Sequence, residues 1–470
     1  MSRTSRLVLL ALVLATPLKF TRAQLPTGTT RPSAEVLAAR VDSIVKADIL
    51  GRGFPSVSIV VTRGGETLLE RAWGMANVAS GRKADPSTTY RIGSVSKQFT
   101  AALVLKLVER GKLSLADSIG RHLTGLRPEW TGITIEQLLN HTSGLPRDYL
   151  DVSRAMESMS GDALIALAAR DTLMSKPGTM NAYSNTGYMM LGVLAAKLYG
   201  KPYGSALRDE IARPLGLRSL TTCDEADPAH AAAGYVRLSD GSTAPPNEQH
   251  LSQTIGPGGI CATAGDLAKW NRALHGGRVL SASTYAAMTT PRGVAVKARY
   301  GFGLSVVPAP WGSPALLHDG QTHGFSSHNG WYPAESLSVT LLYNARPRLE
   351  QNMANVVGLV ALGGTPASSK PVAVVELPVA ATQGAGRPKL VGAYEASAGR
   401  TFIVTFEDGQ LYVMPPGASK QRLFLQSGTS YAVGSADAST IATFHIDDAG
   451  EVTGFTARSN GMDRTLRKIK

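Results

Sequence analysis

Three places in the chain carry a serine followed three residues later by a lysine, a spacing that can activate a serine hydroxyl. They begin at Ser43, Ser80 and Ser94. A serine hydroxyl is a poor nucleophile until a base removes its proton, and a lysine can be that base when burial or a neighbouring cation lowers its pKa. The spacing therefore predicts acyl transfer through a covalent serine ester, at whichever serine lies beside a desolvated lysine.

The elements around these serines favour Ser94. Ser43 lies on an ordinary amphipathic helix, and Ser80 lies in a polar, glycine-containing turn beyond a hairpin. Ser94 instead stands just before the apolar stretch 98–109, which predicts a helix buried nearly all round. Because residues three apart lie on one face of a helix, we expect Lys97 beside Ser94 in its first turn. The helix N-terminus would also offer a backbone N–H to an oxyanion.

The sequence Tyr183-Ser184-Asn185 supplies two further groups of the right kind, and it is the only Tyr-x-Asn in the chain. A loop tyrosine can relay a proton between the serine and a leaving group. An asparagine two residues on can hold a substrate amide. The alternative is a plain loop tyrosine followed by a residue that caps the next helix.

A third candidate is His318-Asp319-Gly320, which follows a strand-like apolar stretch. Two other histidines with a glycine two residues later, His275 and His328, are alternatives, and any of the three could be structural. The five-residue spacing of His318, His323 and His328 matches no zinc-ligand pattern, so we expect no metal and no cofactor. The Gly-x-Ser-x-Gly elbow of α/β-hydrolases is absent from the sequence.

These three motifs, in this order and at this spacing, resemble the class C β-lactamase-related serine hydrolases, which are grouped with the penicillin-binding proteins. The resemblance covers roughly residues 35–360 and is supported by the stretches 90–94, 111–115, 141–146, 183–187 and 324–327. It implies an α+β fold of the β-lactamase/penicillin-binding transpeptidase type. In that fold a five-stranded antiparallel sheet with helices on both faces adjoins an all-helical lobe, and the site lies between them.

The resemblance also implies a role for each residue of the motifs. Ser94 would be the acylated nucleophile, and Lys97 would be its base partner. Tyr183 would act as general base and acid, and Asn185 would bind the substrate amide. Gln321, just after the third motif, would supply the second backbone N–H of an oxyanion hole.

His318 is the departure that bears on the substrate. True β-lactamases usually carry a lysine at this position, two residues before the glycine that is Gly320 here, and its constant charge grips a substrate carboxylate. Histidine is only partly protonated at neutral pH. By having a histidine at this position, the chain resembles some D-Ala-D-Ala carboxypeptidases, D-aminopeptidases and esterases of the family. The resemblance therefore implies a hydrolase other than an efficient β-lactamase.

The expected function is that of a secreted serine hydrolase that forms an acyl-enzyme at Ser94. Its small-molecule or peptide substrates would be amides or esters such as D-amino-acid peptides. A carboxylesterase or a weak class C-like β-lactamase is one alternative. Another is a penicillin-fold binding or sensory protein with little turnover, which an additional C-terminal domain would suit.

Four segments are expected along the chain. Residues 1–23 have the charged, apolar and small-residue order of a secretory signal peptide, so we expect a periplasmic or secreted protein with no lasting membrane anchor. Residues 34–362 would form the hydrolase domain, in which strands at both ends enclose many helices. Residues 363–389, rich in Pro, Ala, Gly and Ser, would be a linker. Residues 390–470 read as a small all-β module that resembles a lipocalin-like barrel.

The 470-residue chain has a net charge of +13, which becomes +9 once the four basic residues of the signal peptide are removed. Because no run of lysine and arginine is interleaved with aromatic residues, nucleic acid is not an expected partner. Cys223 and Cys261 are the only cysteines. In an oxidising compartment they could pair, or each could be a separately buried thiol.

Overall fold

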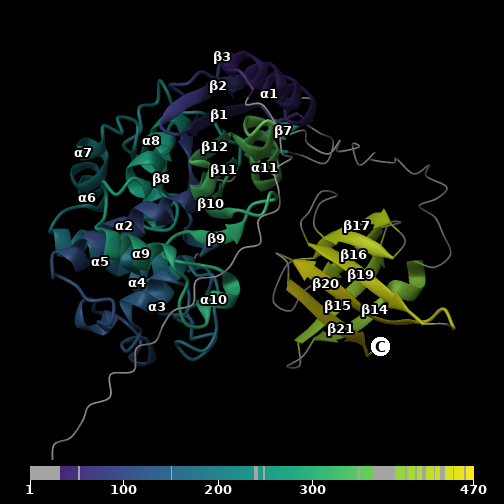
Figure 1. Ribbon diagram of the computed structural model, residues 1–470. Helices are drawn as coiled ribbons and strands as arrows, with labels where there is room; N and C mark the ends of the chain where they lie inside the picture. Colours follow the sequence, from purple (N-terminus) through teal and green to yellow (C-terminus); the bar gives the residue numbers. More distant parts are fainter. Residues whose placement is uncertain are drawn as a thin grey trace, which may run out of the picture. The chain divides into compact units, whose positions relative to one another are not determined.

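The computed structural model of the chain divides into two compact units, Met1–Thr365 and Pro366–Lys470, which are described one at a time (Figure 1). The structure describes residues 32–50, 53–149, 151–237, 242–246, 249–346, 350–364, 387–396, 400–407, 410–414, 420–427, 429–433, 440–447, 449–459 and 462–469. The expected signal peptide and most of the expected linker lie outside the described residues.

A seven-stranded antiparallel sheet forms the centre of the first unit, in the order β3-β2-β1-β12-β11-β10-β9. Its strands are β1 Ser56–Arg63, β2 Glu66–Asn77, β3 Arg82–Lys83, β9 Ser305–Pro308, β10 Pro314–Thr322, β11 Phe325–Tyr332 and β12 Leu337–Tyr343. Because β1 pairs with β12, the sheet is built from both ends of the unit, as the order of elements predicts. The resemblance implies five strands, and the short β3 and β9 extend the sheet at its two edges.

Side chains on opposite faces of β1 enter two different hydrophobic cores. Val57, Ile59 and Val61 pack with the helices α1 and α11, whereas Val60 faces the core of a helical lobe. Alternate residues of a strand point to opposite faces, so the apolar run of β1 predicts cover on both sides. The covering helices are α1 Ala34–Asp48 and α11 Glu350–Ala361 on one face and α8 Ala264–His275 on the other.

The helical lobe is built around α2 (Ser96–Glu109), of which eleven of the fourteen residues are buried, as its apolar sequence predicts. It packs against α5 (Asn185–Tyr199). Further helices of this unit are α3 Ile135–Leu139, α4 Gly161–Ala168, α6 Tyr203–Leu207, α7 Arg213–Leu215, α9 Ala282–Thr289 and α10 Ala295–Ala298. Ser94 lies just outside α2, in a 3-10 turn over Gly93–Val95, and not within the first turn of the α-helix as expected.

Two small sheets complete the first unit, with the strand orders β4-β8-β5 and β13-β6-β7. Their strands are β4 Tyr90–Arg91, β5 Thr221–Thr222, β6 Tyr235–Arg237, β7 Thr243–Ala244, β8 Ile260–Ala262 and β13 Ala345–Arg346. Cys223 and Cys261 form a disulfide, so the two cysteines are not separate thiols. The disulfide ties the chain after β5 to β8, whose other neighbour, β4, leads into the turn that carries Ser94.

The second unit is a closed antiparallel barrel of eight strands. They are β14 Gly392–Ala396, β15 Arg400–Glu407, β16 Gln410–Met414, β17 Gln421–Ser427, β18 Ser430–Val433, β19 Ile441–Ile446, β20 Val452–Ser459 and β21 Met462–Lys468. Successive strands pair, and β14 closes the barrel on β21. The rings of Tyr394, Phe444 and Phe455 pack together in its core. The small all-β barrel expected from the sequence is confirmed.

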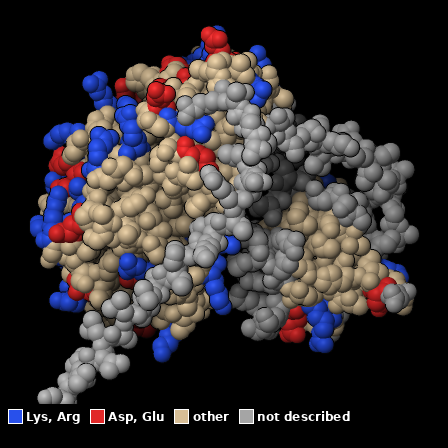
Figure 2. Space-filling view, in the orientation of Figure 1, with Lys and Arg blue, Asp and Glu red and all other residues tan. Residues whose placement is uncertain are grey.

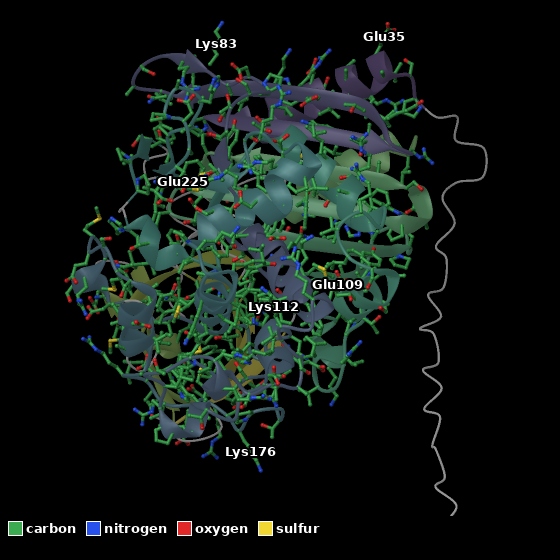
Figure 3. The ribbon with its side chains drawn as sticks, turned by 90° about the vertical axis from the view of Figure 1, so that its left-hand side faces the viewer. Glu35, Lys83, Glu109, Lys112, Lys176 and Glu225 are labelled. Carbon is green, nitrogen blue, oxygen red and sulfur yellow. A yellow bond between two sulfur atoms is a disulfide. The ribbon has the colours of Figure 1, made fainter. Side chains whose placement is uncertain are left out.

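Charged side chains are spread over the surface of the first unit. Figure 2 shows lysine and arginine interspersed with aspartate and glutamate on the face in view. Figure 3 shows Lys83 at the upper edge of the view, Lys176 at the lower edge and Lys112 near the middle. Among the described residues, no helix combines the length and the apolar character needed to cross a membrane.

Candidate active site

Ser94 and Lys97 meet at the start of α2. Ser94 is half-buried in its 3-10 turn, whereas Lys97 is completely buried. The Lys97 Nζ atom lies 3.1 Å from Ser94 Oγ. The other two serines have different surroundings, because the Ser43 hydroxyl donates to the backbone oxygen of Ala39 within α1 and Ser80 is exposed in a turn.

Three oxygen atoms surround the Lys97 Nζ atom. Besides Ser94 Oγ they are Asn185 Oδ1 at 2.8 Å and the backbone oxygen of Pro257 at 3.0 Å. The two carbonyl oxygens can only accept hydrogen bonds, so they take two N–H groups of the lysine. In the ammonium form the third N–H points at Ser94, and in the neutral amine the lone pair takes that place. The neutral lysine is therefore oriented to accept the proton of the Ser94 hydroxyl.

The surroundings of Lys97 favour that neutral form. Burial lowers the pKa of Lys97 well below its usual value, because the ammonium loses its hydration. The nearby Arg147 cation lowers the pKa further, and the Asp148 carboxylate opposes the shift. A lysine with a lowered pKa is available as a base near neutral pH.

Tyr183 and Asn185 enter the same site from the start of α5. Ser184 caps this helix, and its hydroxyl accepts the backbone N–H of Gly187. Tyr183 therefore lies just outside the helix and Asn185 is its first residue. The centre of the Tyr183 ring lies 4.7 Å from Lys97 Nζ, so the structure brings both predicted residues to the buried lysine.

His318 lies on β10, is buried, and has its ring centre 6.2 Å from that of Tyr183. Its Nδ1 atom lies 2.6 Å from the backbone oxygen of Asp319, which can only accept, so Nδ1 carries a hydrogen. Its Nε2 atom lies 2.9 Å from the Tyr300 hydroxyl. Both ring nitrogens of His318 are therefore hydrogen-bonded within the protein.

The backbone of Gln321 lies against the residue that precedes Ser94. Gly93 has a φ of +49°, and a Cβ atom on it would lie 2.8 Å from the backbone nitrogen of Gln321. A Cβ atom on Gly320 would lie 2.1 Å from the backbone oxygen of Ile92. These two glycines let β10 approach the Ser94 turn, so the Gln321 backbone lies beside the residue that precedes Ser94.

His141 belongs to the site, although the sequence motifs gave it no role. It is buried and its ring centre lies 4.3 Å from that of Tyr183. Its Nδ1 atom accepts the backbone N–H of Ser184. Burial lowers the pKa of His141 well below its usual value, because the charged ring would lose its hydration. The residue has a φ of 61°, which is rare outside glycine. The only sequence signal for it was its place at the head of the 141–146 stretch.

The two alternatives to His318 have structural partners instead. His328 on β11 is fully buried, and its Nδ1 atom lies 2.7 Å from Asp319 Oδ1. His275, at the end of α8, bonds to the Tyr285 hydroxyl and stacks on Trp331. Within the part of the chain that the structure describes, no group of three or more His, Cys, Asp or Glu residues could hold a metal ion.

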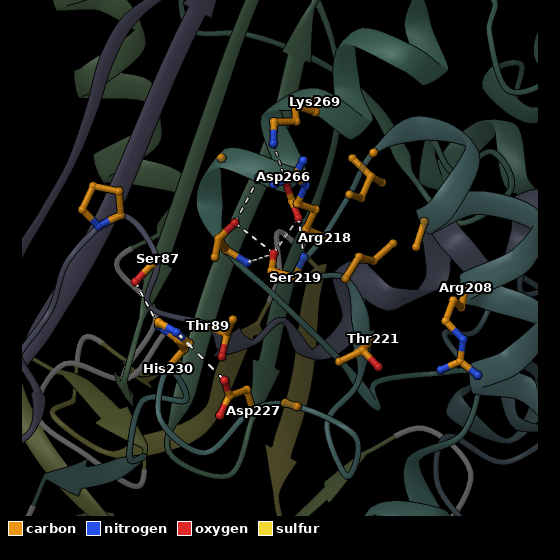
Figure 4. Close-up of a pocket in the computed structure, with 18 of the residues that line it drawn as sticks. Ser87, Thr89, Arg208, Arg218, Ser219, Thr221, Asp227, His230, Asp266 and Lys269 are labelled. Atoms are coloured by element: carbon orange, nitrogen blue, oxygen red, sulfur yellow. Dashed lines mark hydrogen bonds and ion pairs between the residues drawn. The ribbon is translucent and has the colours of Figure 1, made fainter.

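A separate pocket of about 1140 Å³ lies beside the start of α8, and no predicted site residue lines it (Figure 4). On one side Ser87 Oγ lies 3.1 Å from His230 Nδ1, and His230 Nε2 lies 4.0 Å from Asp227 Oδ2. These residue types resemble a serine-histidine-aspartate triad. However, the Ser87 hydroxyl donates to Asp85 Oδ1 at 2.6 Å, so its proton points away from the imidazole. The three residues are also exposed.

Comparison with known proteins gives matches over most of the first unit. The β-lactamase family model matches residues 37–361. The chain is 28% identical to the protein PbpX of Bacillus subtilis (strain 168) over 64% of this chain and 74% of that protein. It is 31% identical to protein flp of Staphylococcus aureus (strain MW2) over 39% of this chain, and the match spans only 38% of the length of flp.

Three solved structures have the same fold. The octameric penicillin-binding protein homologue from Pyrococcus abyssi has a TM-score of 0.63 and 24% identity, covering 92% of this chain and 100% of that one. A D-amino acid amidase from Ochrobactrum anthropi SV3 has a TM-score of 0.61 and 24% identity, covering 69% of this chain and 98% of that one. A D-stereospecific amidohydrolase from Streptomyces sp. has a TM-score of 0.60 and 26% identity, covering 68% of this chain and 97% of that one.

The family model covers well over half of the chain, and it spans the sheet, the helical lobe and the serine–lysine pair that lies between them. The chain therefore belongs to the β-lactamase family and has the β-lactamase fold.

Proposed function

We propose that this hydrolase forms an acyl-enzyme at Ser94 and acts on amides or esters of small acyl groups, such as D-amino-acid derivatives. The observation that carries the proposal is the arrangement around Lys97. The carbonyl oxygens of Asn185 and Pro257 accept two N–H groups of the lysine. The third N–H, or the lone pair of the neutral amine, then points at Ser94 Oγ. A buried lysine in this arrangement is a base for the serine hydroxyl.

The reaction follows from these positions. The Ser94 oxygen attacks the substrate carbonyl carbon, and its proton passes to Lys97 and from there, through the Tyr183 hydroxyl, toward the leaving group. The backbone N–H groups of Ser94 and Gln321 hold the resulting oxyanion. The C–N or C–O bond then breaks, and the leaving group takes up the proton from Tyr183. Water attacks the acyl-serine with the same groups in reverse roles, releases the acid and restores the serine.

Two observations support an amide or ester substrate over a β-lactam antibiotic. The fold is similar to those of a D-stereospecific amidohydrolase and a D-amino acid amidase. In addition, His318 stands where β-lactamases usually have a lysine, and both of its nitrogens are engaged by Asp319 and Tyr300. A side chain whose N–H groups are already bonded is a poor clamp for a substrate carboxylate.

The proposal also includes export. The signal-like order of residues 1–23 motivates it, and the disulfide between Cys223 and Cys261 supports it because disulfides persist in oxidising compartments. Edman sequencing of the protein recovered from the periplasm or medium tests this. We expect a new N-terminus at Gln24, and recovery of the intact chain from the cytoplasm alone would contradict export.

A substrate panel tests the chemistry. Nitrocefin, p-nitrophenyl butyrate, D-alanine p-nitroanilide and a D-Ala-D-Ala peptide are incubated with the wild type and with Ser94→Ala. We expect Ser94-dependent turnover of the anilide or the ester, little turnover of nitrocefin, and an acyl adduct on the Ser94 peptide by mass spectrometry. Turnover of nitrocefin above the others would favour a β-lactamase, and no Ser94-dependent turnover would favour a binding protein.

A further inference from the structure

An acidic residue, Asp148, lies one side chain away from the catalytic lysine. The Asn185 side chain joins the two: its Oδ1 atom accepts from Lys97 Nζ at 2.8 Å, and its Nδ2 atom donates to Asp148 Oδ1 at 2.6 Å. The Asp148 side chain is 46% exposed. A partly exposed carboxylate thus lies next to Asn185.

The loop around Asp148 is anchored on both sides of it. The backbone N–H of Asn185 donates to the backbone oxygen of Arg147 at 2.7 Å. On the other side Tyr149 is buried, and its hydroxyl donates to the backbone oxygen of Gln253. Because its neighbours are fixed, the carboxylate has a defined position relative to Asn185.

The second oxygen of this carboxylate has room for another donor. Asp148 Oδ2 forms an ion pair with Arg147 Nε at 3.6 Å, a distance too long for a hydrogen bond. The Arg147 guanidinium also lies over the Tyr183 ring, 5.2 Å from the ring centre. Arg147 therefore leaves Asp148 with unfilled acceptor capacity toward the solvent side of the site.

The place of Asp148 matches one part of a substrate. Once the acyl carbon lies at Ser94 Oγ, the substituent on the neighbouring α-carbon extends toward Asn185, the residue expected to hold the acyl-side amide. An α-ammonium group would there meet the Asp148 carboxylate, and charge-assisted hydrogen bonds of this kind are among the stronger ones. An acyl group without the amine would offer the Asp148 carboxylate no charged partner.

We propose that Asp148 is a specificity-determining residue that binds the free α-ammonium group of aminoacyl amides or esters. The inference rests on the proposed function and narrows it to substrates with an unblocked amine next to the scissile carbonyl. The alternative is a site in which Arg147 binds a carboxylate of the substrate.

The test compares two anilides that differ only in the amine, D-alanine p-nitroanilide and propionic acid p-nitroanilide. Asp148→Asn keeps an oxygen that can accept from Asn185 Nδ2 but removes the charge, and Arg147→Gln is the matched control on the neighbouring charge. The readout is the ratio of the two kcat/KM values, which cancels any loss common to both substrates. We expect Asp148→Asn to lower the ratio about tenfold or more, and Arg147→Gln not to lower it.

A binding measurement makes the result independent of turnover. Calorimetry with the full-length Ser94→Ala protein compares D-alaninamide with propionamide, and we expect tighter binding of the amine, lost when Asp148→Asn is added. An unchanged ratio in Asp148→Asn together with equal binding of the two amides would overturn the inference. So would a preference for succinyl over butyryl p-nitroanilide that Arg147→Gln abolishes, because that marks an anion site. Absence of Ser94-dependent turnover of any ester or anilide would instead overturn the proposed function.

Discussion

Ser94 and Ser87 each have a basic side chain within 3.1 Å of the hydroxyl oxygen, but the two pairs lie in opposite surroundings. The base beside Ser94 is a completely buried lysine. The base beside Ser87 is a histidine whose side chain is 52% exposed. The Ser87 hydroxyl donates to Asp85 and not to its histidine, whereas the lysine nitrogen has carbonyl partners that leave one position for the serine.

The difference shows that residue types do not by themselves make a nucleophile. A lysine is almost fully protonated at neutral pH by its ordinary pKa. Burial, assisted by the Arg147 cation, lowers the pKa of Lys97 well below that value. A histidine is the usual base beside a reactive serine, but no proton from Ser87 points toward this exposed one. Desolvation and hydrogen-bond direction, both set by tertiary structure, separate the two regions.

The largest expected effect is that of Lys97→Met, which keeps the volume of the side chain but removes the base. We expect kcat on p-nitrophenyl butyrate to fall by about 10³-fold or more, as in other catalytic units that act together. Steady-state kinetics with circular dichroism as a folding control measures it. A Lys97→Met protein that keeps wild-type kcat would show that burial of this lysine is structural.

The same variant has a signature in stability. Because burial disfavours the ammonium of Lys97, the unfolded chain binds more protons than the folded one between the lowered pKa and the unfolded value of about 10.4. Wild-type stability should therefore rise relative to Lys97→Met as pH increases through that window, by at most ~1.4 kcal/mol per pH unit. Urea unfolding at neutral and alkaline pH measures the difference. Parallel pH profiles for the two proteins would contradict a lowered pKa.

Tyr183→Phe is expected to have the next largest effect. It removes the hydroxyl that would carry the proton to the leaving group but keeps the ring that packs on His141. We expect a loss of about 10²-fold or more in kcat with the unfolding free energy nearly unchanged. Rates on a matched amide and ester measure it, and the amide should lose more because its leaving group needs the proton. Equal activity to the wild type would assign proton transfer to Lys97 alone.

Gly93→Ala should damage the site through the backbone. The added Cβ atom would lie 2.8 Å from the Gln321 backbone, which forces β10 away from the Ser94 turn. We expect about 10²-fold lower kcat/KM, since displacing one oxyanion donor costs that much. Gly111→Ala is the matched control, because Gly111 also has a positive φ of 66° but nothing lies within 4 Å of its Cβ position. Similar losses in both variants would mean that backbone strain, and not contact with Gln321, causes the effect.

The smallest expected effect is that of Ser87→Ala. If the pocket beside α8 contributes no nucleophile, kcat and KM on every substrate of the panel should match the wild type. Loss of ester turnover in Ser87→Ala with retention in Ser94→Ala would reverse the comparison between the two regions. The readout is the ester rate of each single variant and of the double variant.

Much of the fold could be predicted from sequence where the pattern is local. The apolar run of α2, the hairpin between β1 and β2 around Gly64-Gly65, and the closing helix α11 all lie where their periodicity and turn residues place them. Within residues 390–470 the stretches 401–406, 411–414, 440–446 and 452–457 have a strand-like pattern, and they form β15, β16, β19 and β20. No such pattern predicts β14, β17, β18 and β21. Those four strands alternate less clearly, and their pairing with sequence neighbours supplies what their own pattern does not.

The site divides in the same way. The types and order of the Ser94, Tyr183 and His318 motifs could be read from the chain, because each is a local spacing. The contributions of His141 and Asp148 could not, since they depend on a loop that folds against the start of α5. No sequence pattern specifies that the backbone oxygen of Pro257 is a partner of the lysine.

The sequence by itself determined which groups could react, and it singled out Ser94 among three serines because an apolar helix follows only that one. Tertiary structure alone decided that the pKa of Lys97 is lowered, that its nitrogen faces Ser94 Oγ, and that a carboxylate lies beside Asn185. The physical reason is that pKa, hydrogen-bond direction and the field at a site depend on atoms brought together from distant parts of the chain.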